Sequence, residues 1–386
     1  MKNCFRSTLS CQFNFHFNNI YMKQITVIFL LLIVIINVSS CSSKKVDKYN
    51  SIKIDLSCQD NALLVSFFID TVKTIKLCLP DPYFFGIVTD ILFTDSSLFV
   101  VDKKQCNILH FKMDGTFLNK IGNKGKAPGE FISLHRCFIG DKYIYVSDIN
   151  TRRIHYYTHT GEYLKSIQSS FDLVYDDIVA LPNGKFLCHD IQGNEGESKI
   201  WLMSEDGKKE QTFLYHKAVY PYSYTEWNTI TTTPFDDILR IFDPITGCFY
   251  EYNYRTEKLK ECECFVSNRK GLESFKSIET FENIDAEYAF PSFVIETNSF
   301  FYSIWTTSEL IGLHVLYEKK EKNVRVSRRL SMDFVNYPMC PLPVSTNLSN
   351  VMVGIMTDEY PLEYFPEKYR YCVSEQTAIV YLMEFR

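Results

Sequence analysis

The sequence predicts an all-β fold that repeats one four-stranded unit, and three observations carry this prediction. Aromatic residues make up 15% of the chain, with 31 Phe and 25 Tyr, and such side chains suit the half-buried surface of pleated sheets. The stretches around Asp102 and Asp148 match position by position at an offset of 46 residues. Within them, short runs of alternating apolar and polar residues lie between turn signals, as is typical of strands.

The repeat is clearest between residues 97–122 and 143–168. Its matched pairs are Asp102 and Asp148, Ile108 and Ile154, Phe111 and Tyr157, Gly115 and Gly161, Leu118 and Leu164, and Ile121 and Ile167. The unit recurs less regularly around Asp190 and Asp243, in residues 299–330 and near the C-terminus. Repeats of about 40 to 50 residues with four short antiparallel strands are typical of β-propeller blades. We therefore predict a β-propeller with six blades, within a range of five to seven.

The strands of a blade can be placed from the alternation and the turns. In the second unit, three strands are predicted near residues 143–147, 154–157 and 163–167, and Gly161 marks a hairpin turn. A further strand precedes these three and is expected to line the centre of the ring. The predicted innermost strands are residues 87–93, 133–139, 175–181, 228–233 and 291–297.

Residues 120–131, KIGNKGKAPGEF, are predicted to connect two blades. The chain must return across three gaps between strands, roughly 14 Å, which about five to eight extended residues cover. Gly125 and Gly129 permit a positive φ, and the Pro-Gly pair indicates a turn. Phe131 is expected to fill the gap between neighbouring blades. The glycines do not have the spacing of a nucleotide-binding P-loop.

Residues 122–131 resemble the G-x-G-x-G-P-G-E-[FY] joint of NHL-type propellers, and more closely that of the six-bladed β-propeller lipoproteins of Bacteroidetes. The resemblance covers roughly residues 72–386. It implies that an early strand, here residues 71–79, pairs with the C-terminal strand, here residues 377–385, and so removes the exposed sheet edges. The chain departs from the family in showing the glycine joint clearly only once, and in lacking Asn-Pro before the last strand.

The first 40 residues have the pattern of a bacterial lipoprotein signal. The apolar run 25–36 is too short to span a bilayer of about 30 Å as a helix, and it follows Lys23 as an apolar region follows a positive one in secretory signals. Residues 38–41, Val-Ser-Ser-Cys, resemble the lipobox, in which the cysteine is acylated. An ordinary cleaved signal and an uncleaved anchor are the alternatives.

Three regions follow from this pattern. Residues 1–40 are predicted to be an upstream extension and a signal peptide, with Met22 as the start and cleavage before Cys41. Residues 41–70 are predicted to be a lipid-tethered linker and N-terminal segment, and residues 71–386 the propeller. The membrane is therefore an expected partner through a lipid at Cys41. No acidic run follows Cys41, which favours the periplasmic side of the outer membrane.

The charge of the chain argues against nucleic acid as a partner. Removing the three basic residues of positions 1–40, which hold no acid, leaves 38 basic and 46 acidic side chains, a net charge of about −8. A nucleic-acid-binding protein needs a basic surface to neutralise phosphates. The mature chain as a whole offers none.

Ten of the thirteen cysteines follow position 41, and none forms a CxxC pair, so the usual zinc and redox spacings are missing. Most are predicted to be small buried apolar residues. Cys262 and Cys264 share one strand face, which is poor geometry for a bond between them. One or two disulfides remain open for an exported chain.

Polar residues on the predicted innermost strands could converge on the axis of the ring. They are Asp90, His135, Arg136, Asp176, Asp177 and Glu296. Such a set could bind a sugar, a peptide terminus or a metal, and we select His135, Arg136, Asp176 and Asp177 as predicted ligand-binding residues. The alternative is that these side chains are solvated or serve as hydrogen-bonded packing groups.

Residues 220–227, YPYSYTEW, are a second candidate surface, because Tyr and Trp supply large amphipathic contact area. Tyr222, Tyr224 and Trp227 are predicted to contact a ligand, with packing between blades as the alternative. The aspartates that end the second strands, Asp102, Asp148, Asp190 and Asp243, are predicted to be turn formers that bond the backbone two residues on. The acid pairs 176–177 and 236–237 could ligate Ca²⁺, but no loop has EF-hand spacing.

We therefore predict a non-catalytic binding lipoprotein of the bacterial cell envelope whose ligand is a glycan, a peptide or an envelope protein. The alternative is a metal-assisted lyase or hydrolase that uses the channel, as in some NHL-like propellers. His135 is the one histidine on the predicted innermost strands, and no G-x-S-x-G elbow is present. No catalytic residue, metal ligand or cofactor is assigned, and Ca²⁺ is the one ion kept open. A purely structural role would predict no polar pocket at either mouth of the ring.

Overall fold

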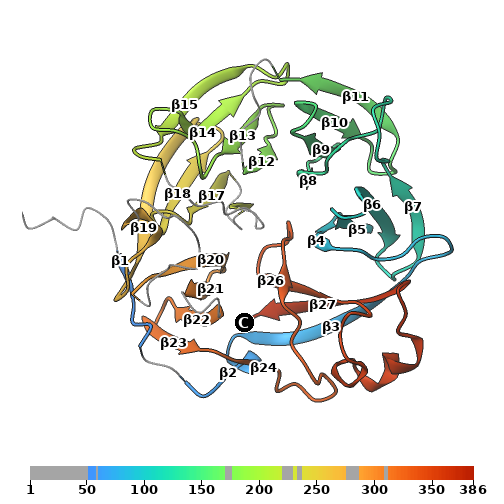
Figure 1. Ribbon diagram of the computed structural model, residues 1–386. Helices are drawn as coiled ribbons and strands as arrows, with labels where there is room; N and C mark the ends of the chain where they lie inside the picture. The colour runs from blue at the N-terminus through green and yellow to red at the C-terminus, as the bar shows by residue number, and fades with distance from the viewer. Residues whose placement is uncertain are drawn as a thin grey trace, which may run out of the picture. The chain divides into compact units, whose positions relative to one another are not determined.

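Six antiparallel sheets follow one another around a ring in the computed structural model (Figure 1). The structure describes residues 51–57, 60–169, 176–219, 229–232, 237–274, 287–307 and 312–386. They belong to one unit, Tyr49–Arg386. Within these described ranges, no helix has the length and apolar character that crossing a membrane requires.

The strands are grouped by blade. Blade 1 contains β4 (Val88–Phe93), β5 (Ser97–Asp102), β6 (Asn107–Lys112) and β7 (Phe117–Ile121), and blade 2 contains β8 (Arg136–Ile139), β9 (Ile144–Asp148), β10 (Arg153–Tyr157) and β11 (Tyr163–Gln168). Blade 3 contains β12 (Asp177–Ala180), β13 (Phe186–His189), β14 (Ser198–Met203) and β15 (Lys209–Tyr215). Blade 4 contains β16 (Ile230–Thr232), β17 (Ile238–Asp243), β18 (Cys248–Asn253) and β19 (Lys258–Ser267), with β1 (Ser51–Ile54) beside β19.

Blade 5 contains β20 (Ala289–Glu296), β21 (Phe300–Thr307), β22 (Gly312–Glu318) and β23 (Asn323–Ser327), and blade 6 contains β25 (Pro343–Val344), β26 (Val351–Met356), β27 (Thr377–Phe385) and β3 (Ile69–Cys78). A two-stranded sheet joins β2 (Leu63–Leu64) to β24 (Leu330–Ser331). The short 3₁₀ helices are η1 (Val65–Phe67), η2 (Leu272–Ser274), η4 (Leu362–Tyr364) and η5 (Glu367–Cys372). The predicted six-bladed β-propeller is therefore confirmed.

The predicted innermost strands are confirmed in place, with differences at their ends. Each of β4, β8, β12, β16 and β20 lies within or overlaps its predicted range. The strand predicted at 133–139 is shorter, because β8 begins at Arg136. Before it, the chain is held by side-chain bonds from Ile132 and Ser133 to Asp148 rather than by a full strand ladder.

The two ends of the propeller chain close the ring, as the resemblance implied. β27 pairs antiparallel with β3, from Thr377 opposite Cys78 to Phe385 opposite Ile69. Residues 378–383 of β27 are mostly apolar, and their side chains pack alternately into apolar clusters on the two faces of the sheet. β27 is therefore covered on both faces. β27 lies between β26 and β3, so the edges of these two strands that face it are both paired.

The joint between blades 1 and 2 behaves as predicted, except at one glycine. Phe131 is fully buried and packs with residues of both blades, such as Ile121 and Val146. Gly129 has a φ of +80° as expected, and so has Gly122 at +72°. Gly125 does not use the positive φ that a glycine permits. A Cβ there would meet the Glu130 carboxylate, which is the end of a flexible side chain and can move away.

The residues before β3 form an N-terminal strap, defined as residues 51–57 and 60–68, which lies across blades 4 to 6. β1 pairs in parallel with β19, with Ser51 opposite Cys264, and Ile52 and Ile54 are buried in a cluster with side chains of blade 5. The strap then bonds to blade 5, where the Asp60 amide donates to the Val326 carbonyl oxygen at 2.6 Å. Residues 41–50 of the predicted linker and N-terminal segment lie outside the described residues.

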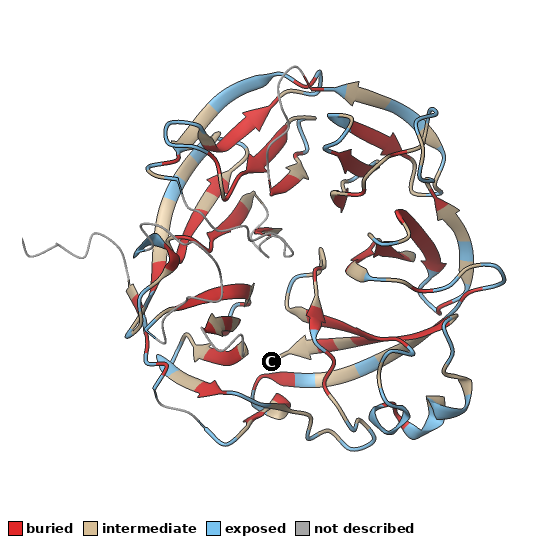
Figure 2. Ribbon diagram, in the orientation of Figure 1, coloured by how far each residue is buried: buried red, intermediate tan, exposed pale blue. Residues whose placement is uncertain are grey.

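The core lies between the blades rather than at the centre of the ring. Clusters of buried apolar side chains occupy each interface between neighbouring sheets. Figure 2 shows buried residues along the inner strands and exposed ones along the outermost strands. Stacked sheets about 10 Å apart form such layers when both faces of each blade are apolar.

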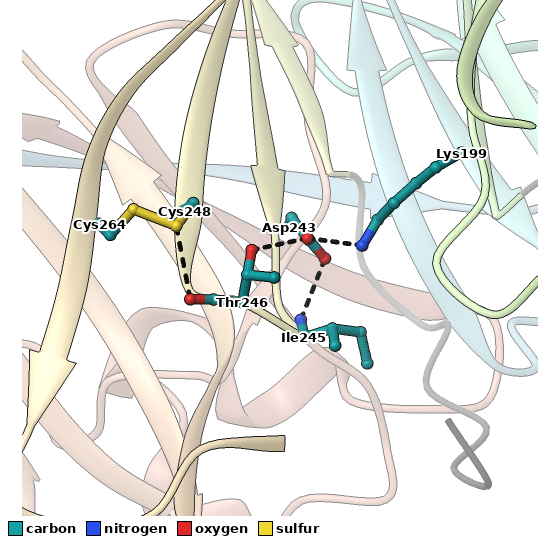
Figure 3. Close-up of a disulfide and its surroundings, with 6 residues drawn as sticks. All are labelled: Lys199, Asp243, Ile245, Thr246, Cys248 and Cys264. Atoms are coloured by element: carbon teal, nitrogen blue, oxygen red, sulfur yellow. Dashed lines mark hydrogen bonds and ion pairs between the residues drawn. A yellow bond between two sulfur atoms is a disulfide. The ribbon is translucent and has the colours of Figure 1, made fainter. Parts of the chain in front are cut away.

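One disulfide joins Cys248 and Cys264, which lie opposite each other on β18 and β19 (Figure 3). One disulfide agrees with the one or two that the sequence left open. Cys264 is bonded to Cys248 and not to Cys262, as expected. The free cysteines among the described residues are Cys78, Cys106, Cys137, Cys188, Cys262, Cys340 and Cys372. Four of these are buried, which agrees with the predicted role as small apolar residues.

Candidate functional site

Three of the residues selected from the sequence come together at the junction of blades 2 and 3. The Arg136 guanidinium Nε donates a hydrogen bond to the Asp176 carbonyl oxygen and lies 3.9 Å from Asp177 Oδ1. All three residues are buried. They therefore contribute a polar contact between two blades, in the interior of the ring wall.

Both carboxylates are also bonded by backbone amides. Asp177 Oδ2 accepts hydrogen bonds from the amides of Thr229, at 2.6 Å, and Ile230, at 2.8 Å, where the chain enters blade 4. Asp176 Oδ2 accepts one from the Ile191 amide at 2.6 Å. Burial raises the pKa of Asp176 to about 7 and raises that of Asp177, against the lowering effect of these bonds.

The other selected residues lie elsewhere. His135 is half-buried immediately before β8, and its amide donates to the Ser147 carbonyl oxygen at 3.0 Å. Tyr222, Tyr224 and Trp227, and Cys41 with its expected lipid, lie outside the described residues. The same holds for Asp236 of the second acid pair.

The repeated aspartates form turns as predicted, with an additional role. Asp148 Oδ1 accepts from the Asn150 amide at 3.0 Å, and Asp190 and Asp243 bond the amides two residues on in the same way. Asp148 Oδ2 also accepts from Ile132, on the chain that enters the blade. One side chain thus fixes both the turn and the entry of the first strand.

Buried polar side chains continue this wall between blades 3 and 4. The Lys199 ammonium donates to Asp243 Oδ2 at 2.6 Å (Figure 3), and His189 Nδ1 lies 2.7 Å from Thr229 Oγ1. Burial lowers the pKa of His189 to about 4, so the ring is neutral at physiological pH. These groups join blades and are not exposed to solvent.

A cavity of about 530 Å³ opens where turns of blades 2, 3 and 4 meet. We call it the tyrosine cavity. Its lining residues that carry functional groups are Asp141, Lys142, Tyr143, Tyr145, Tyr156, Asn183, Glu205 and Tyr254. Its volume lies within the range of roughly 300 to 1,000 Å³ that is usual for small-molecule sites.

Three tyrosines of blade 2 form the aromatic wall of this cavity. The rings of Tyr145 and Tyr156 lie 4.8 Å apart at 64°, and Tyr143 meets both rings edge-on. The Lys165 ammonium lies 4.6 Å from the centre of the Tyr156 ring and 2.7 Å from Glu205 Oε1. The wall is therefore fixed on one side by a cation–π contact and an ion pair.

The tyrosine hydroxyls supply hydrogen-bonding groups. The buried Tyr156 hydroxyl has no partner among the described residues, which is uncommon for a buried polar atom. Burial raises the pKa of Tyr145 to about 12 and raises that of Tyr156 further, so both hydroxyls stay protonated. With the exposed carboxylates of Asp141 and Glu205, the cavity offers donors, acceptors and aromatic rings.

The sequence reasoning missed this cavity. Its signal was present in residues 143–147, where Tyr143 and Tyr145 fall on one face of a strand. That alternation indicated a strand, but the opposing wall comes from residues 179–184 of blade 3 and from Tyr254 of blade 4. No spacing within one repeat brings these segments together.

Among the described residues, one group has the spacing of metal ligands. Cys248, Cys264 and Glu261 place their ligand atoms within 4.8 Å of one another. The two sulfur atoms are bonded to each other, so neither is available as a thiolate ligand.

The ring of six four-stranded sheets, closed by β27 on β3, defines the protein as a six-bladed β-propeller. The predicted resemblance to propeller proteins of Bacteroidetes is confirmed by the matches that follow. The chain belongs to the family described as a domain of unknown function, DUF4934, whose model matches residues 50–378. No curated protein matches the chain.

Similar solved structures agree on the fold. A protein of Bacteroides fragilis NCTC 9343 described as exported shares 16% identity, with a TM-score of 0.70 over 87% of this chain and 100% of that chain. A member of the DUF4221 family from Bacteroides vulgatus ATCC 8482 shares 10% identity, with a TM-score of 0.50 over 83% of this chain and 98% of that one. At these identities the likeness establishes the fold and not the function.

Proposed function

We propose that this protein is a non-catalytic binding lipoprotein of the bacterial envelope, and that the tyrosine cavity binds a glycan. The observation that carries the proposal is the combination of an aromatic wall with the polar side chains of Asp141, Asn183 and Glu205 in the same lining. Sugars present apolar C–H faces to aromatic rings and hydroxyls to donors and acceptors, and the cavity supplies both.

The charges of the cavity support a glycan over a phosphorylated ligand. Its lining contains two carboxylates, Asp141 and Glu205, and one cation, Lys142. The nearby Lys165 ammonium is already paired with Glu205. The two carboxylates are balanced by Lys142 and Lys165, so the cavity offers an anionic ligand no excess of positive charge, which suits a neutral sugar.

Attachment to the envelope rests on the lipobox-like residues that end at Cys41. The similar protein described as exported agrees with this location. A periplasm-facing anchor in the outer membrane is the proposed arrangement. A peptide or an envelope protein as ligand would appear in the binding test below as absence of glycan binding.

The binding test compares two hydroxyl deletions. Oligosaccharides of glucose, mannose and N-acetylglucosamine are screened on an array with the purified chain, and hits are titrated by calorimetry. Tyr143 lines the cavity and is half-buried, and Tyr143→Phe is expected to weaken binding about two- to tenfold, which is the net effect of one hydrogen bond. The matched control is Tyr381→Phe, which removes a buried hydroxyl outside the cavity. No glycan binding, or equal loss in both variants, would refute the ligand assignment.

The anchor and the enzymatic alternative have separate tests. Cys41→Ser should move the protein from the membrane fraction to the soluble fraction, and retention in the membrane would refute lipidation at this residue. Stoichiometric Ca²⁺ or Zn²⁺ in the purified protein would favour the alternative, a metal-assisted lyase or hydrolase.

A further inference from the structure

One edge of blade 5 carries a concentration of basic residues in a chain of net charge −5. Residues 318–329 contain six basic side chains and two acidic ones. They occupy the last residue of β22, the turn between β22 and β23, the outermost strand β23 and the two residues that follow it (Figure 1). The remainder of the chain is correspondingly more acidic, so this stretch stands out electrostatically.

Lys319 and Arg325 form ion pairs within the structure. Lys319 Nζ lies 2.7 Å from Glu296 Oε1, and Arg325 lies 3.7 Å from Asp60 and 4.4 Å from the centre of the Phe67 ring. These contacts hold the turn and the strap in place.

Three further cations are exposed, and we call them the basic edge: Lys320, Lys322 and Arg329. The side chain of Lys320 is 88% exposed, and the nearby Glu321 carboxylate lies 3.7 Å away on the surface. An exposed pair of this kind is weak, because water screens it. The basic edge therefore keeps its charge available to a partner.

The basic edge lies beside the N-terminal strap. Asp60 forms a bridge with Ser327, and the Leu63 amide donates to the Arg329 carbonyl oxygen at 2.9 Å. The strap begins at β1, and Ser51 is ten positions after Cys41. An extended chain covers at most about 3.5 Å per residue, so a lipid at Cys41 would keep Ser51 within about 35 Å of the membrane.

We propose that the basic edge docks on the anionic phospholipid head groups of the membrane that holds the anchor. This inference rests on the proposed lipid at Cys41, which selects the side of the ring that faces the bilayer. A lipid chain combined with a basic surface binds anionic membranes more firmly than either alone. In the order of the ring, blade 2 is opposite blade 5, so docking turns the tyrosine wall of blade 2 away from the bilayer.

The test measures binding to vesicles without the anchor. The mature chain with Cys41→Ser is sedimented with vesicles of phosphatidylcholine alone, or of phosphatidylcholine and phosphatidylglycerol at about 7:3. Binding is expected only with phosphatidylglycerol at about 50 mM salt, and it should disappear at about 500 mM, where the Debye length falls below about 5 Å.

Two variants with the same charge change locate the surface. Lys320→Gln, Lys322→Gln and Arg329→Gln together should lower the partition coefficient about 100-fold, because each basic residue near the surface contributes about fivefold. The control combines Lys104→Gln, Lys124→Gln and Lys126→Gln, which are exposed on or after blade 1, and should retain binding. Equal loss in both variants, or equal binding to both vesicle types, would overturn the proposal.

The docking surface and the glycan site can be tested separately. Glycan binding by the Lys320–Lys322–Arg329 variant should be unchanged, since none of these residues lines the tyrosine cavity. If the chain with Cys41 fractionates with the membrane but the Cys41→Ser chain does not bind vesicles, the proposed docking surface is wrong and the proposed anchor is not.

Discussion

Lys199 of blade 3 and Asp243 of blade 4 form an ion pair at 2.6 Å, with side chains 6% and 0% exposed. Asp243 also accepts hydrogen bonds from the Ile245 amide at 3.1 Å and the Thr246 hydroxyl at 2.7 Å (Figure 3). Burial alone would raise the pKa of Asp243, but Lys199 and these bonds hold it below its usual value. The pair is thus a satisfied polar joint between two blades.

Removing one partner of this joint should destabilise the protein strongly. Asp243→Asn leaves the Lys199 ammonium buried without a counter-charge, and such a change costs about 3 to 5 kcal/mol. Urea unfolding followed by circular dichroism measures the free energy of unfolding. The control is Asp206→Asn, which removes the exposed partner of Lys208 and should leave stability unchanged. A loss of less than about 1 kcal/mol for Asp243→Asn would contradict the assigned role.

Acid should weaken the fold because two buried histidines resist protonation. Burial lowers the pKa of His189 and of His314 to about 4, from an ordinary 6.5. Between pH 6.5 and 4 the unfolded chain binds protons that the folded chain does not, so stability is present above pH 6.5 and is lost as the pH falls through this window. Each histidine contributes up to about 3 kcal/mol.

The contribution of His314 to the pH dependence of stability can be isolated with one variant. His314→Gln keeps a group able to bond the Tyr302 hydroxyl, which lies 2.8 Å from His314 Nδ1, and removes the titration. Its free energy of unfolding should fall less than that of the wild type between pH 6.5 and 4. Asp176 acts in the opposite direction, because its pKa of about 7 makes stability rise as the pH falls from 7 toward 3.8. Parallel pH curves for wild type and His314→Gln would show that His314 does not contribute.

Gly122 and Phe131 should be energetically coupled. A Cβ at Gly122 would lie 2.2 Å from Phe131 Cε1, and Gly122 has a φ of +72°. Gly122→Ala therefore forces the ring to move as well as straining the backbone. Phe131→Ala alone should cost about 3 to 5 kcal/mol, as for other large buried aromatics. In the Phe131→Ala background, Gly122→Ala should cost only the backbone strain of about 1 to 2 kcal/mol.

A double-mutant cycle by urea unfolding measures this coupling, which is expected to exceed about 1 kcal/mol. Gly196→Ala is the matched control, because Gly196 has a φ of +82° and no atom within 4 Å of the added Cβ. It isolates the cost of a positive φ. If the losses of stability from Gly122→Ala and Phe131→Ala were strictly additive, the contact between the two residues would not explain the cost of Gly122→Ala.

The disulfide should stabilise the hairpin that receives the N-terminal strap. Cys248 and Cys264 are separated by 16 residues, and a cross-link of this span contributes about 3 kcal/mol. Cys248→Ala with Cys264→Ala should lower the free energy of unfolding by that amount, and dithiothreitol should lower the wild type similarly. Cys78→Ala, at an exposed free cysteine, is the control. An unchanged wild type under reducing conditions would argue against the bond.

Local patterns predicted the blades well, because their signals lie within a few residues. Alternation in residues 143–147 and the glycine at 161 placed β9 and the turn before β11. The aspartate turns followed from a side chain that bonds the backbone two residues away. Closure by β27 and β3 was accessible only through the resemblance, because about 300 residues separate the two strands.

Features assembled from distant segments were not predicted. β1 is four residues long, and its partner β19 lies more than 200 positions later, so a short alternating run beside a polar linker gave no cue. The tyrosine cavity needs three blades at once. Arg136 and Asp177 were placed on inner strands correctly, and Asp176 lies immediately before one. The environment of the two carboxylates depends on other segments, because the amides of Ile191, Thr229 and Ile230 bond to them.

The pairing of β3 with β27 sets the order in which the molecule can be completed. The strand that seals the ring, Thr377–Phe385, is synthesised about 300 residues after its partner β3. Contacts so distant in sequence form slowly, since a long loop must close before they are gained. A chain cut short before Thr377 would present both β26 and β3 as unpaired edges, and such edges recruit strands from other molecules.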